Sequence, residues 1–439
     1  MNTLSKKTNI TSLFSKYVFQ NILGMLGISA YILADTFFIS QAEGANGLTA
    51  LNLVLPLYSF IFAIGSMIGV GSATKFKIQF AKNASDSQDY FSNSIFWSIV
   101  ISVVFILIGL LIPDKLIKLL GGDTDIVKLG TPYTKIFMTF APFFMLNYIF
   151  NAFVRNDGSP SLAMAATLSS SLFNIVMDYI LMFPLKMGMS GAALATAFSP
   201  IVGVIICSFH FISGKNNIKF KLQLPSFKKL AVSCQLGISA FIGELSSGIT
   251  TVIFNFLILG LAGNEGISAY GIVANVAIVA TAIFNGISQG SQPLFSEYYG
   301  RGSHKSIRQI LKLSIVTALI IAAIMVLAVN TLKSPIVNIF NSDNNKIMYE
   351  YAIKGLPLYF IGFIFAGFNI VGTGYLSATE SALWAFITSI LRGIIAISIC
   401  AFVLSKLFGM TGIWLAFPTS EIITAGLMFL AIRRSKIRV

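Results

Sequence analysis

Residues 17–40 read YVFQNILGMLGISAYILADTFFIS, and these 24 residues contain one charged side chain, Asp35. A helix needs about 20 mainly apolar residues to cross the hydrocarbon core of a bilayer. The stretch is therefore long enough to span a membrane. It also lacks the small-residue cleavage site that follows the short core of a signal peptide. We interpret it as a retained first membrane-spanning helix.

The rest of the chain repeats this pattern. Of the 439 residues, 56% are apolar and 10% are charged, and the mean hydropathy is +0.83. Soluble proteins carry about 25% charged residues, so the composition excludes a cytosolic enzyme. Apolar runs separated by charged or Gly- and Pro-rich gaps predict an all-α integral membrane protein of twelve transmembrane helices. The eleven further spans are expected near 48–73, 91–113, 130–153, 161–184, 189–213, 232–260, 267–296, 309–332, 352–377, 382–404 and 410–431.

The basic residues are distributed unevenly between the predicted loops. The chain has 30 Lys and Arg against 16 Asp and Glu, which gives a net charge of +14. With the N-terminus placed inside, 20 of the basic residues fall in inner segments and 9 in outer segments. Cytoplasmic loops of membrane proteins carry such an excess of Lys and Arg. We therefore expect both termini in the cytoplasm, and we attribute the basic charge to topology and not to a nucleic-acid partner.

The two halves of the chain resemble each other. Residues 188–199 (GMSGAALATAFS) match residues 409–420 (GMTGIWLAFPTS) at an offset of 221. Two shorter matches come earlier in each half: 65–72 with 286–293 at the same offset, and 130–137 with 355–362 at an offset of 225. Because six helices form each half, the halves have the same orientation and are related by an axis along the membrane normal. We predict two pseudo-symmetric six-helix lobes around a central cleft: an N-lobe over 1–213, a cytoplasmic linker over 214–231 and a C-lobe over 232–439.

Few side chains are available for covalent or metal chemistry. The sequence has three cysteines without metal-ligand spacing and two histidines, both near the ends of predicted spans. The polar turn 155–160 lacks the Gly-rich pattern and the lysine of a nucleotide-binding loop, so we interpret it as structural. We expect no catalytic residues, no cofactor and no nucleotide partner.

Four acidic residues lie inside predicted spans: Asp35, Asp178, Glu244 and Glu421. A carboxylate at the bilayer centre costs about 2.5–3.5 kcal/mol even on the lenient insertion scale, so such residues are functional candidates. The alternative for each is a structural hydrogen bond or a place at a span end that reaches water, and for Glu421 that alternative is favoured. Arg392 is the one basic residue that we place in a span, and its partner is Glu244 or Glu421 unless it lines the cleft.

One predicted span carries a polar cluster. Asn174 and Asp178 are four residues apart and share a helix face, and Thr196 lies on the next span. Carboxylate, amide and hydroxyl oxygens suit a proton relay or a hard monovalent cation. At the offset of 221, Asn174 and Asp178 correspond to Ile395 and Ile399. The cluster therefore belongs to the N-terminal half alone, which indicates a local function.

Several motifs resemble those of the multidrug and toxic compound extrusion (MATE) transporters. They are 31-YILADTFFIS-40, 153-FVRNDGSP-160, 173-FNIVMDYILMF-183, 191-GAALAT-196, 269-AYGIV-273 and 289-QGSQPLFSEYYG-300. The resemblance covers nearly the whole chain and is closest to bacterial drug-efflux members. It implies two six-helix lobes, a place in the cytoplasmic (inner) membrane and export of drug-like compounds.

The resemblance also implies roles for individual residues. In the family, an N-lobe network takes up H+ or Na+ and couples it to bending of the first helix, and its positions here are Asp35, Asn174, Asp178 and Thr196. The positions that line the substrate cleft are Tyr31, Asn147 and Asn151. Glu244 resembles a seventh-span acid that is found in part of the family, and it is placed in the cleft on that ground. No metal site is implied beyond a Na+ ion at the first four residues.

This sequence departs from the family at three prolines. The family often has prolines in the first span, directly after the fifth-span acid and near the start of the seventh span, where this chain has Phe19 and Gln20, Tyr179 and Ser239. The first span therefore lacks the proline around which a kink would be centred. Gly24 and Gly27 offer flexibility instead, because Gly weakens a helix by about 1 kcal/mol relative to Ala.

Together these features predict a monomeric secondary antiporter. We expect it to export small organic cations across the cytoplasmic membrane in exchange for H+ or Na+ by alternating access. The alternatives are a flippase for a lipid-linked precursor, which usually has more helices and a cationic cleft, and an exporter of an endogenous metabolite. An integral-membrane enzyme would need a nucleophile beside a histidine or paired acids. The sequence leaves the substrate and the coupling ion open.

Overall fold

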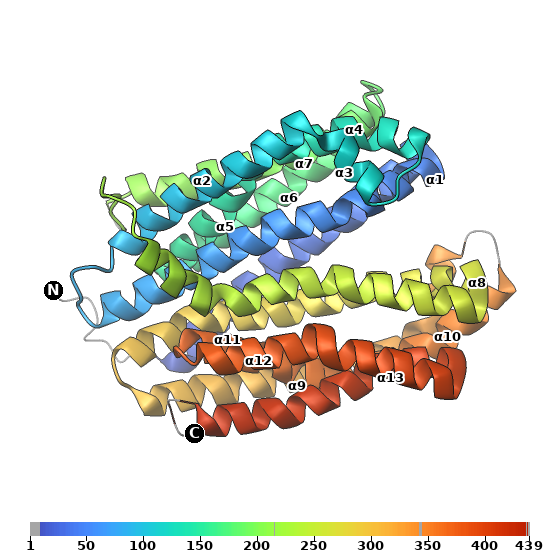
Figure 1. The fold of residues 1–439 in the computed structure, drawn as a ribbon. Coiled ribbons are helices and arrows are strands. Elements are labelled where there is room, and N and C mark those ends of the chain that lie inside the picture. The colour runs from blue at the N-terminus through green and yellow to red at the C-terminus, as the bar shows by residue number, and fades with distance from the viewer. Residues whose placement is uncertain (1–8, 215, 342–344, 436, 438–439) are drawn as a thin grey trace. The chain divides into compact units, whose positions relative to one another are not determined.

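The computed structural model describes residues 9–214, 216–341, 345–435 and 437. These residues form helices joined by turns and short extended segments, and no strand occurs among them. In chain order (Figure 1) the elements are α1 (Ile10–Ala81), α2 (Asp89–Leu111), α3 (Pro113–Leu119), α4 (Thr124–Thr139), α5 (Ala141–Asn156), α6 (Pro160–Met182), α7 (Gly188–Ile212), α8 (Phe227–Gly300), α9 (His304–Phe340), α10 (Lys346–Phe360), α11 (Phe363–Ala378), α12 (Ala382–Ile390), the π-helix η1 (Leu391–Ala396) and α13 (Ile397–Arg434).

Several spans are joined or broken within these helices. α1, α8 and α13 break at Gly44, Gly263 and Gly409, where φ is 60°, 61° and 57°, a conformation that glycine adopts without a steric penalty. α4 with α5 and α10 with α11 are spans bent by 48° and 46°. α1, α8 and the run α12–η1–α13 supply two spans each, and each bent pair supplies one. α2, α6, α7 and α9 add one each, which makes twelve spans in the described chain. The predicted all-α fold of twelve spans in two lobes is confirmed.

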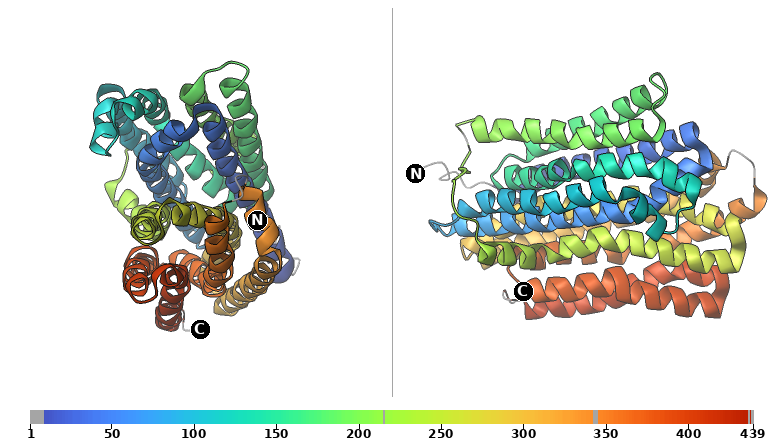
Figure 2. Two further views of the ribbon diagram at one scale, coloured as in Figure 1. Left: turned by 90° about the vertical axis from the view of Figure 1, so that its right-hand side faces the viewer. Right: turned by 45° about the horizontal axis from the view of Figure 1, so that its top comes forward.

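The breaks recur at equivalent positions in the two halves. Gly188 begins α7 with φ 53°, and Gly409 has φ 57° at the offset of 221 found in the sequence. Gly44 and Gly263 form a second pair, at the slightly different offset of 219. At Gly409 the last two spans turn back and lie side by side (Figure 2), and a Cβ added at Gly412 would overlap the backbone oxygen of Leu404. The sequence repeat therefore corresponds to a structural repeat.

Helix α2 shows how the sequence suits a bilayer. Its buried side chains include Ser94, Ser98 and Ser102, one turn apart, whereas Val104 and Leu107 are exposed. A soluble helix buries its apolar side chains and exposes its polar ones, so α2 has the opposite arrangement. Small residues let α2 approach α4 and α5, and the apolar outer face matches lipid tails.

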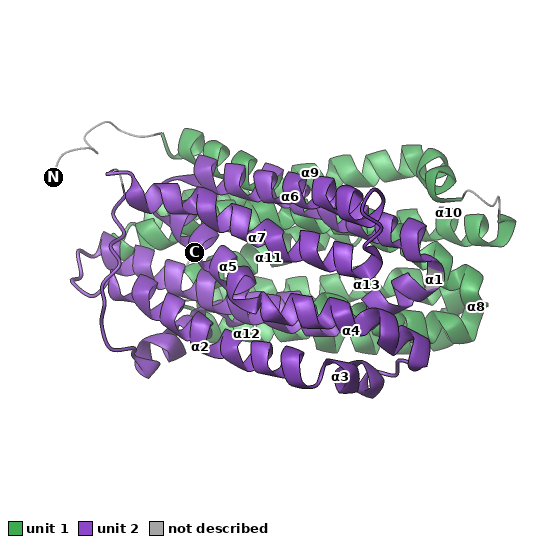
Figure 3. Ribbon diagram, turned by 90° about the horizontal axis from the view of Figure 1, so that it is seen from above, with its two compact units in different colours: residues 1–22, 246–439 green, residues 23–245 purple. Residues whose placement is uncertain are grey.

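The described residues divide into two compact units (Figure 3). We call Leu23–Leu245 the first unit, which is purple and keyed unit 2 in Figure 3. The second unit, green and keyed unit 1, consists of the described parts of Met1–Ile22 and Ser246–Val439. The first unit contains apolar clusters around Phe137 and Phe153, and the second contains one around Phe363. The lobe boundaries drawn from the sequence stay a prediction.

Two glycines mark a close helix crossing inside the first unit. A Cβ added at Gly237 of α8 would overlap the backbone oxygen of Met67 in α1, and one added at Gly71 would overlap the backbone oxygen of Ser233. The two backbones approach this closely because neither glycine has a side chain. Small residues allow the same kind of approach at membrane helix interfaces generally.

The segment that follows α7 is attached to the first unit by hydrogen bonds. The Asn217 backbone N–H donates to Asp157 Oδ2 at 2.8 Å and its amide donates to Oδ1 at 3.0 Å. His210 Nε2 lies 2.8 Å from the same Oδ2, and the Lys219 N–H donates to Gln88 Oε1 at 2.8 Å. The polar turn at 155–160 therefore holds this segment in place.

Candidate functional site

Asp35 on α1 and Asp178 on α6 meet inside the first unit. Both are buried, with exposed fractions of 8% and 0%, and their carboxyl groups lie within interaction range of each other. No N–H or O–H donor of the described residues reaches either oxygen of Asp178 or Oδ1 of Asp35. An ionised carboxylate only accepts hydrogen bonds, so the two groups can bond to each other only when one of them carries a proton.

Asn174 and Thr196 extend this pair toward α7. Asn174 lies one turn before Asp178 on α6, and its amide donates to Thr196 Oγ1 at 3.3 Å. Both residues are buried, and no donor of the described chain reaches Asn174 Oδ1. The structure thus links the four predicted ion-coupling residues through contacts and helix spacing. Their donor-free oxygens suit a proton or a cation.

Tyrosines surround the acids. Tyr31, one turn before Asp35 on α1, lies within electrostatic range of Asp35, Glu244 and Asp178. The Tyr148 hydroxyl of α5 donates to Glu244 Oε1 at 3.5 Å, which is a long hydrogen bond. Of the predicted cleft residues, Tyr31 and Glu244 therefore belong to the same neighbourhood as the aspartates.

Asn147 and Asn151 contact the neighbouring helices. The Asn151 amide donates to Thr167 Oγ1 of α6 at 3.2 Å. Asn147 Oδ1 is buried without a donor among the described residues, and it occupies the space that a Cβ at Gly203 of α7 would need. Within the described chain neither side chain hydrogen-bonds to the acids, and their place along the substrate cleft stays a prediction.

The first span is helical where the family proline is missing. Phe19 and Gln20 lie in uninterrupted helix, and the break in α1 comes later, at Gly44. A Cβ at Gly27 would lie 2.7 Å from Leu168 Cδ2 of α6. Gly27 therefore lets α1 approach α6 two turns before Asp35.

The second unit contains its own polar cluster. Arg392 Nε donates to Glu421 Oε1 at 2.8 Å and Oε2 at 3.1 Å. The Asn369 amide donates to Glu421 Oε2 at 2.7 Å. The structure thus assigns Glu421, and not Glu244, as the partner that the sequence left open for Arg392.

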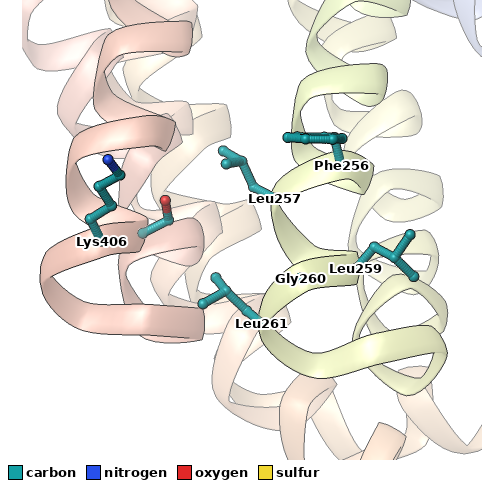
Figure 4. A pocket seen from close by; sticks show the side chains of 7 residues that line it. Phe256, Leu257, Leu259, Gly260, Leu261 and Lys406 are labelled. Atoms are coloured by element: carbon teal, nitrogen blue, oxygen red, sulfur yellow. The ribbon is translucent and has the colours of Figure 1, made fainter.

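A groove of about 420 Å³ also lies in the second unit, lined by Phe256, Leu257, Leu259, Gly260, Leu261, Ser405 and Lys406. Figure 4 shows Leu257 and Leu261 of α8 pointing toward the helix that carries Lys406. The lining is almost wholly apolar, and it includes none of the predicted site residues.

Sequence reasoning missed two tyrosines of the site. Tyr58 lies within electrostatic range of Asp35 and Asp178, and Tyr148 contacts Glu244. Both stand in apolar runs, where an aromatic residue is more often part of the packing. The one available signal was the place of Tyr148 beside Asn147, a predicted cleft residue.

Comparisons with known proteins agree over most of the chain. A family model described as MatE matches residues 21–180 and 240–402. The "Multidrug export protein MepA" of Staphylococcus aureus (strain MRSA252) is 29% identical over 396 residues, which cover 89% of this chain and 86% of that protein.

Two solved structures share the fold. A MATE crystallised in complex with MaL6 matches with a TM-score of 0.91 at 19% identity, over 97% of this chain and 96% of that one. A MOP superfamily transporter from Pyrococcus furiosus matches with a TM-score of 0.90 at 19% identity, over 98% and 97%. At this identity the likeness concerns the fold alone.

Proposed function

The chain belongs to the MatE family, and from this premise we propose that it is a secondary antiporter that exports small organic, cationic, drug-like compounds in exchange for H+ or Na+. The name of the S. aureus relative, a multidrug export protein, supports the substrate class. The length and apolar character of the helices support a multi-pass protein. We place it in the cytoplasmic membrane as a monomer with both termini inside, which the distribution of basic residues supports.

The observation that carries the proposal is the meeting of two buried carboxyl groups, those of Asp35 and Asp178, whose buried oxygens lack donors in the described chain. Two buried carboxyl groups that meet without another donor need a proton or a cation between them. Loss of that ion leaves two like charges in contact. At about 4 Å and an effective dielectric constant near 20 they repel by about 4 kcal/mol. This energy is large enough to shift a conformational equilibrium.

The repulsion acts between two helices. Asp35 belongs to α1 and Asp178 to α6, and Gly27 lets these helices approach each other nearby. With the ion bound, the pair holds α1 against α6. When the ion leaves, α1 separates from α6 at this level, and the binding site becomes negatively charged and attractive to a cationic substrate. Ion and substrate thereby compete for the same charge, which is the requirement for exchange.

The surroundings of Asp35 suit a flat organic cation. Tyr31 and Tyr148 are partly exposed aromatic residues, and Glu244 supplies a further carboxyl group. Cations bind over aromatic rings with about 0.5–2 kcal/mol per contact, and stacking adds affinity for planar molecules. Such a site selects charge and shape and not one molecule.

The function is tested by ethidium efflux from proteoliposomes, driven first by a proton gradient and then by a sodium gradient. Efflux under one gradient supports the antiporter and identifies the coupling ion. If ethidium stays inside under both gradients while labelled lipid changes leaflet, the protein is a flippase. If neither moves, an endogenous metabolite replaces drugs as the cargo.

A further inference from the structure

Arg392 is held by a single nitrogen. Its Nε–H donates to both carboxylate oxygens of Glu421, and its two terminal amino groups make no hydrogen bond within the described chain. A guanidinium has five N–H donors, so four of them remain available. The Arg392 side chain is 26% exposed and that of Glu421 is 3% exposed. The Arg392 side chain is therefore partly accessible while its anchor is buried.

Glu421 is fixed in turn by Asn369. The fully buried Asn369 amide donates to Glu421 Oε2 at 2.7 Å and to the Glu421 backbone oxygen at 2.9 Å. The carboxylate that orients Arg392 is thus fixed by its own helix, α13, and by Asn369 on α11. This arrangement is pre-organised, because the guanidinium loses little freedom when a ligand binds.

The depth of Arg392 makes unused donors costly. Arg392 lies ten residues beyond Ala382, where the span begins. This spacing places it about 15 Å along the helix axis. Charged side chains at such depth pair with partners or mark a ligand path. Arg392 also lies on the π-helix Leu391–Ala396, and π-helical turns are frequently found at functional sites.

The structural repeat does not require this cluster. At the offset of 221, Arg392 corresponds to Ser171 and Glu421 to Pro200, and residues 170–175 form ordinary α-helix. The first half builds the same scaffold without an ion pair at this place. The charged residues and the π-helix are therefore specific to the second half.

An aromatic surface lies beside the cluster. Tyr359 is within electrostatic range of Glu421 and Arg392, and its ring stacks on Phe417 with centroids 4.4 Å apart and an interplanar angle of 10°. Phe417 is only half-buried. A planar ligand that reaches Arg392 finds an aromatic ring nearby.

We propose that Arg392 binds the anionic group of a transported molecule, with an aromatic carboxylate as the ligand class. The terminal amino groups form the planar fork that matches a carboxylate, Glu421 and Asn369 position the guanidinium, and Phe417 contacts the ring. The proposal rests on the proposed export function and adds to it the residue that recognises the anionic group of a cargo.

The test compares norfloxacin, which has an ammonium group and a ring carboxylate, with its ethyl ester, which lacks the free carboxylate. Both are bound to the purified full-length protein in nanodiscs, and the readout is the ratio of the two affinities. The unaltered protein prefers the acid. Arg392→Gln lowers the ratio by about 10-fold, because a charge-assisted bidentate contact is lost. Arg392→Lys gives an intermediate ratio.

Glu421→Gln separates binding from structure. The variant removes the negative charge of Glu421, which repels a ligand carboxylate, and it keeps Arg392. The ratio of acid affinity to ester affinity therefore rises. Arg433→Gln changes an arginine on α13, the helix that carries Glu421, and it leaves the ratio unchanged. If Arg392→Gln and Glu421→Gln lower the affinities for acid and ester alike, the pair is only structural and the proposal falls. It also falls if the unaltered protein binds the ester as tightly as the acid. Ethidium lacks a carboxylate, so its efflux tests the export function separately.

Discussion

The buried carboxyl groups of Asp35 and Asp178 lie within interaction range of each other, and no hydrogen-bond donor of the described chain reaches either Asp178 oxygen. The two residues come from α1 and α6, so the protonation of the pair and the contact between these helices depend on each other. This relationship makes ion binding, stability and transport measurable through the same residues.

The first prediction concerns stability. An ion that binds the folded protein raises its melting temperature by mass action. The melting temperature in detergent should therefore rise with Na+ at constant ionic strength if Na+ is the ion, or with falling pH if it is H+. Asp178→Asn should remove this response, and Asp125→Asn, at an exposed acid, should keep it. An unchanged response in Asp178→Asn would contradict the assignment.

The second prediction concerns substrate binding at Glu244. Glu244→Gln removes a negative charge near Tyr31 and should weaken ethidium binding by about 10-fold, which corresponds to 1.4 kcal/mol. Tyr148→Phe removes only the 3.5 Å hydrogen bond and should change the affinity by less than about 3-fold. Fluorescence titration of the purified variants measures both. Equal affinities for Glu244→Gln and the unaltered protein would exclude Glu244 from the site.

The third prediction concerns the crossing at Gly237. Gly237→Ala places a methyl group against the Met67 backbone, which cannot move aside like a flexible side chain. Overpacking of this kind costs about 1–3 kcal/mol, and the melting temperature should fall. Gly243→Ala on the same helix meets nothing within 4 Å and should be neutral or slightly stabilising. Equal melting temperatures of the two variants would show that the crossing is loose.

The fourth prediction concerns the segment after α7. Asp157→Ala removes the acceptor for both Asn217 donors and the partner of His210. The segment should then separate from the first unit more often, and trypsin should cleave faster at the exposed Lys219 and Lys221. Asp125→Ala serves as the control. Cleavage at the unaltered rate would mean that the remaining hydrogen bonds hold the segment alone.

The spans were predictable because the bilayer imposes a simple rule of length and apolarity. The predicted span 91–113 corresponds to α2 at Asp89–Leu111, and 161–184 corresponds to α6 at Pro160–Met182. The first span was predicted too short, since its helix begins at Ile10. Helix ends beyond the apolar core carry polar residues, so hydropathy does not detect them.

Local departures from ideal helix were not predictable. The apolar run 130–153 reads as one straight span, whereas the structure begins α4 at Thr124 and bends by 48° before α5. The π-helix at Leu391–Ala396 has no signature in its sequence. Both depend on how neighbouring helices pack, and a single chain pattern does not record this packing.

Partners across helices were predictable only in part. The spacing of Asn174 and Asp178 indicated one helix face, and the family resemblance grouped them with Asp35 and Thr196. The partner of Arg392 stayed open because sequence separation says nothing about which spans are neighbours. Tyr58 and Tyr148 were missed for the same reason.

The central claim is that the Asp35–Asp178 pair couples an ion gradient to export, and Asp35→Asn tests it most directly. Proteoliposomes containing the unaltered or the Asp35→Asn protein are assayed for ethidium efflux under the effective ion gradient and for exchange of ethidium at equal concentrations without a gradient. We predict that the variant loses gradient-driven efflux at least about 10-fold while the exchange continues, because the substrate path remains. Gradient-driven efflux at the unaltered rate would contradict the account.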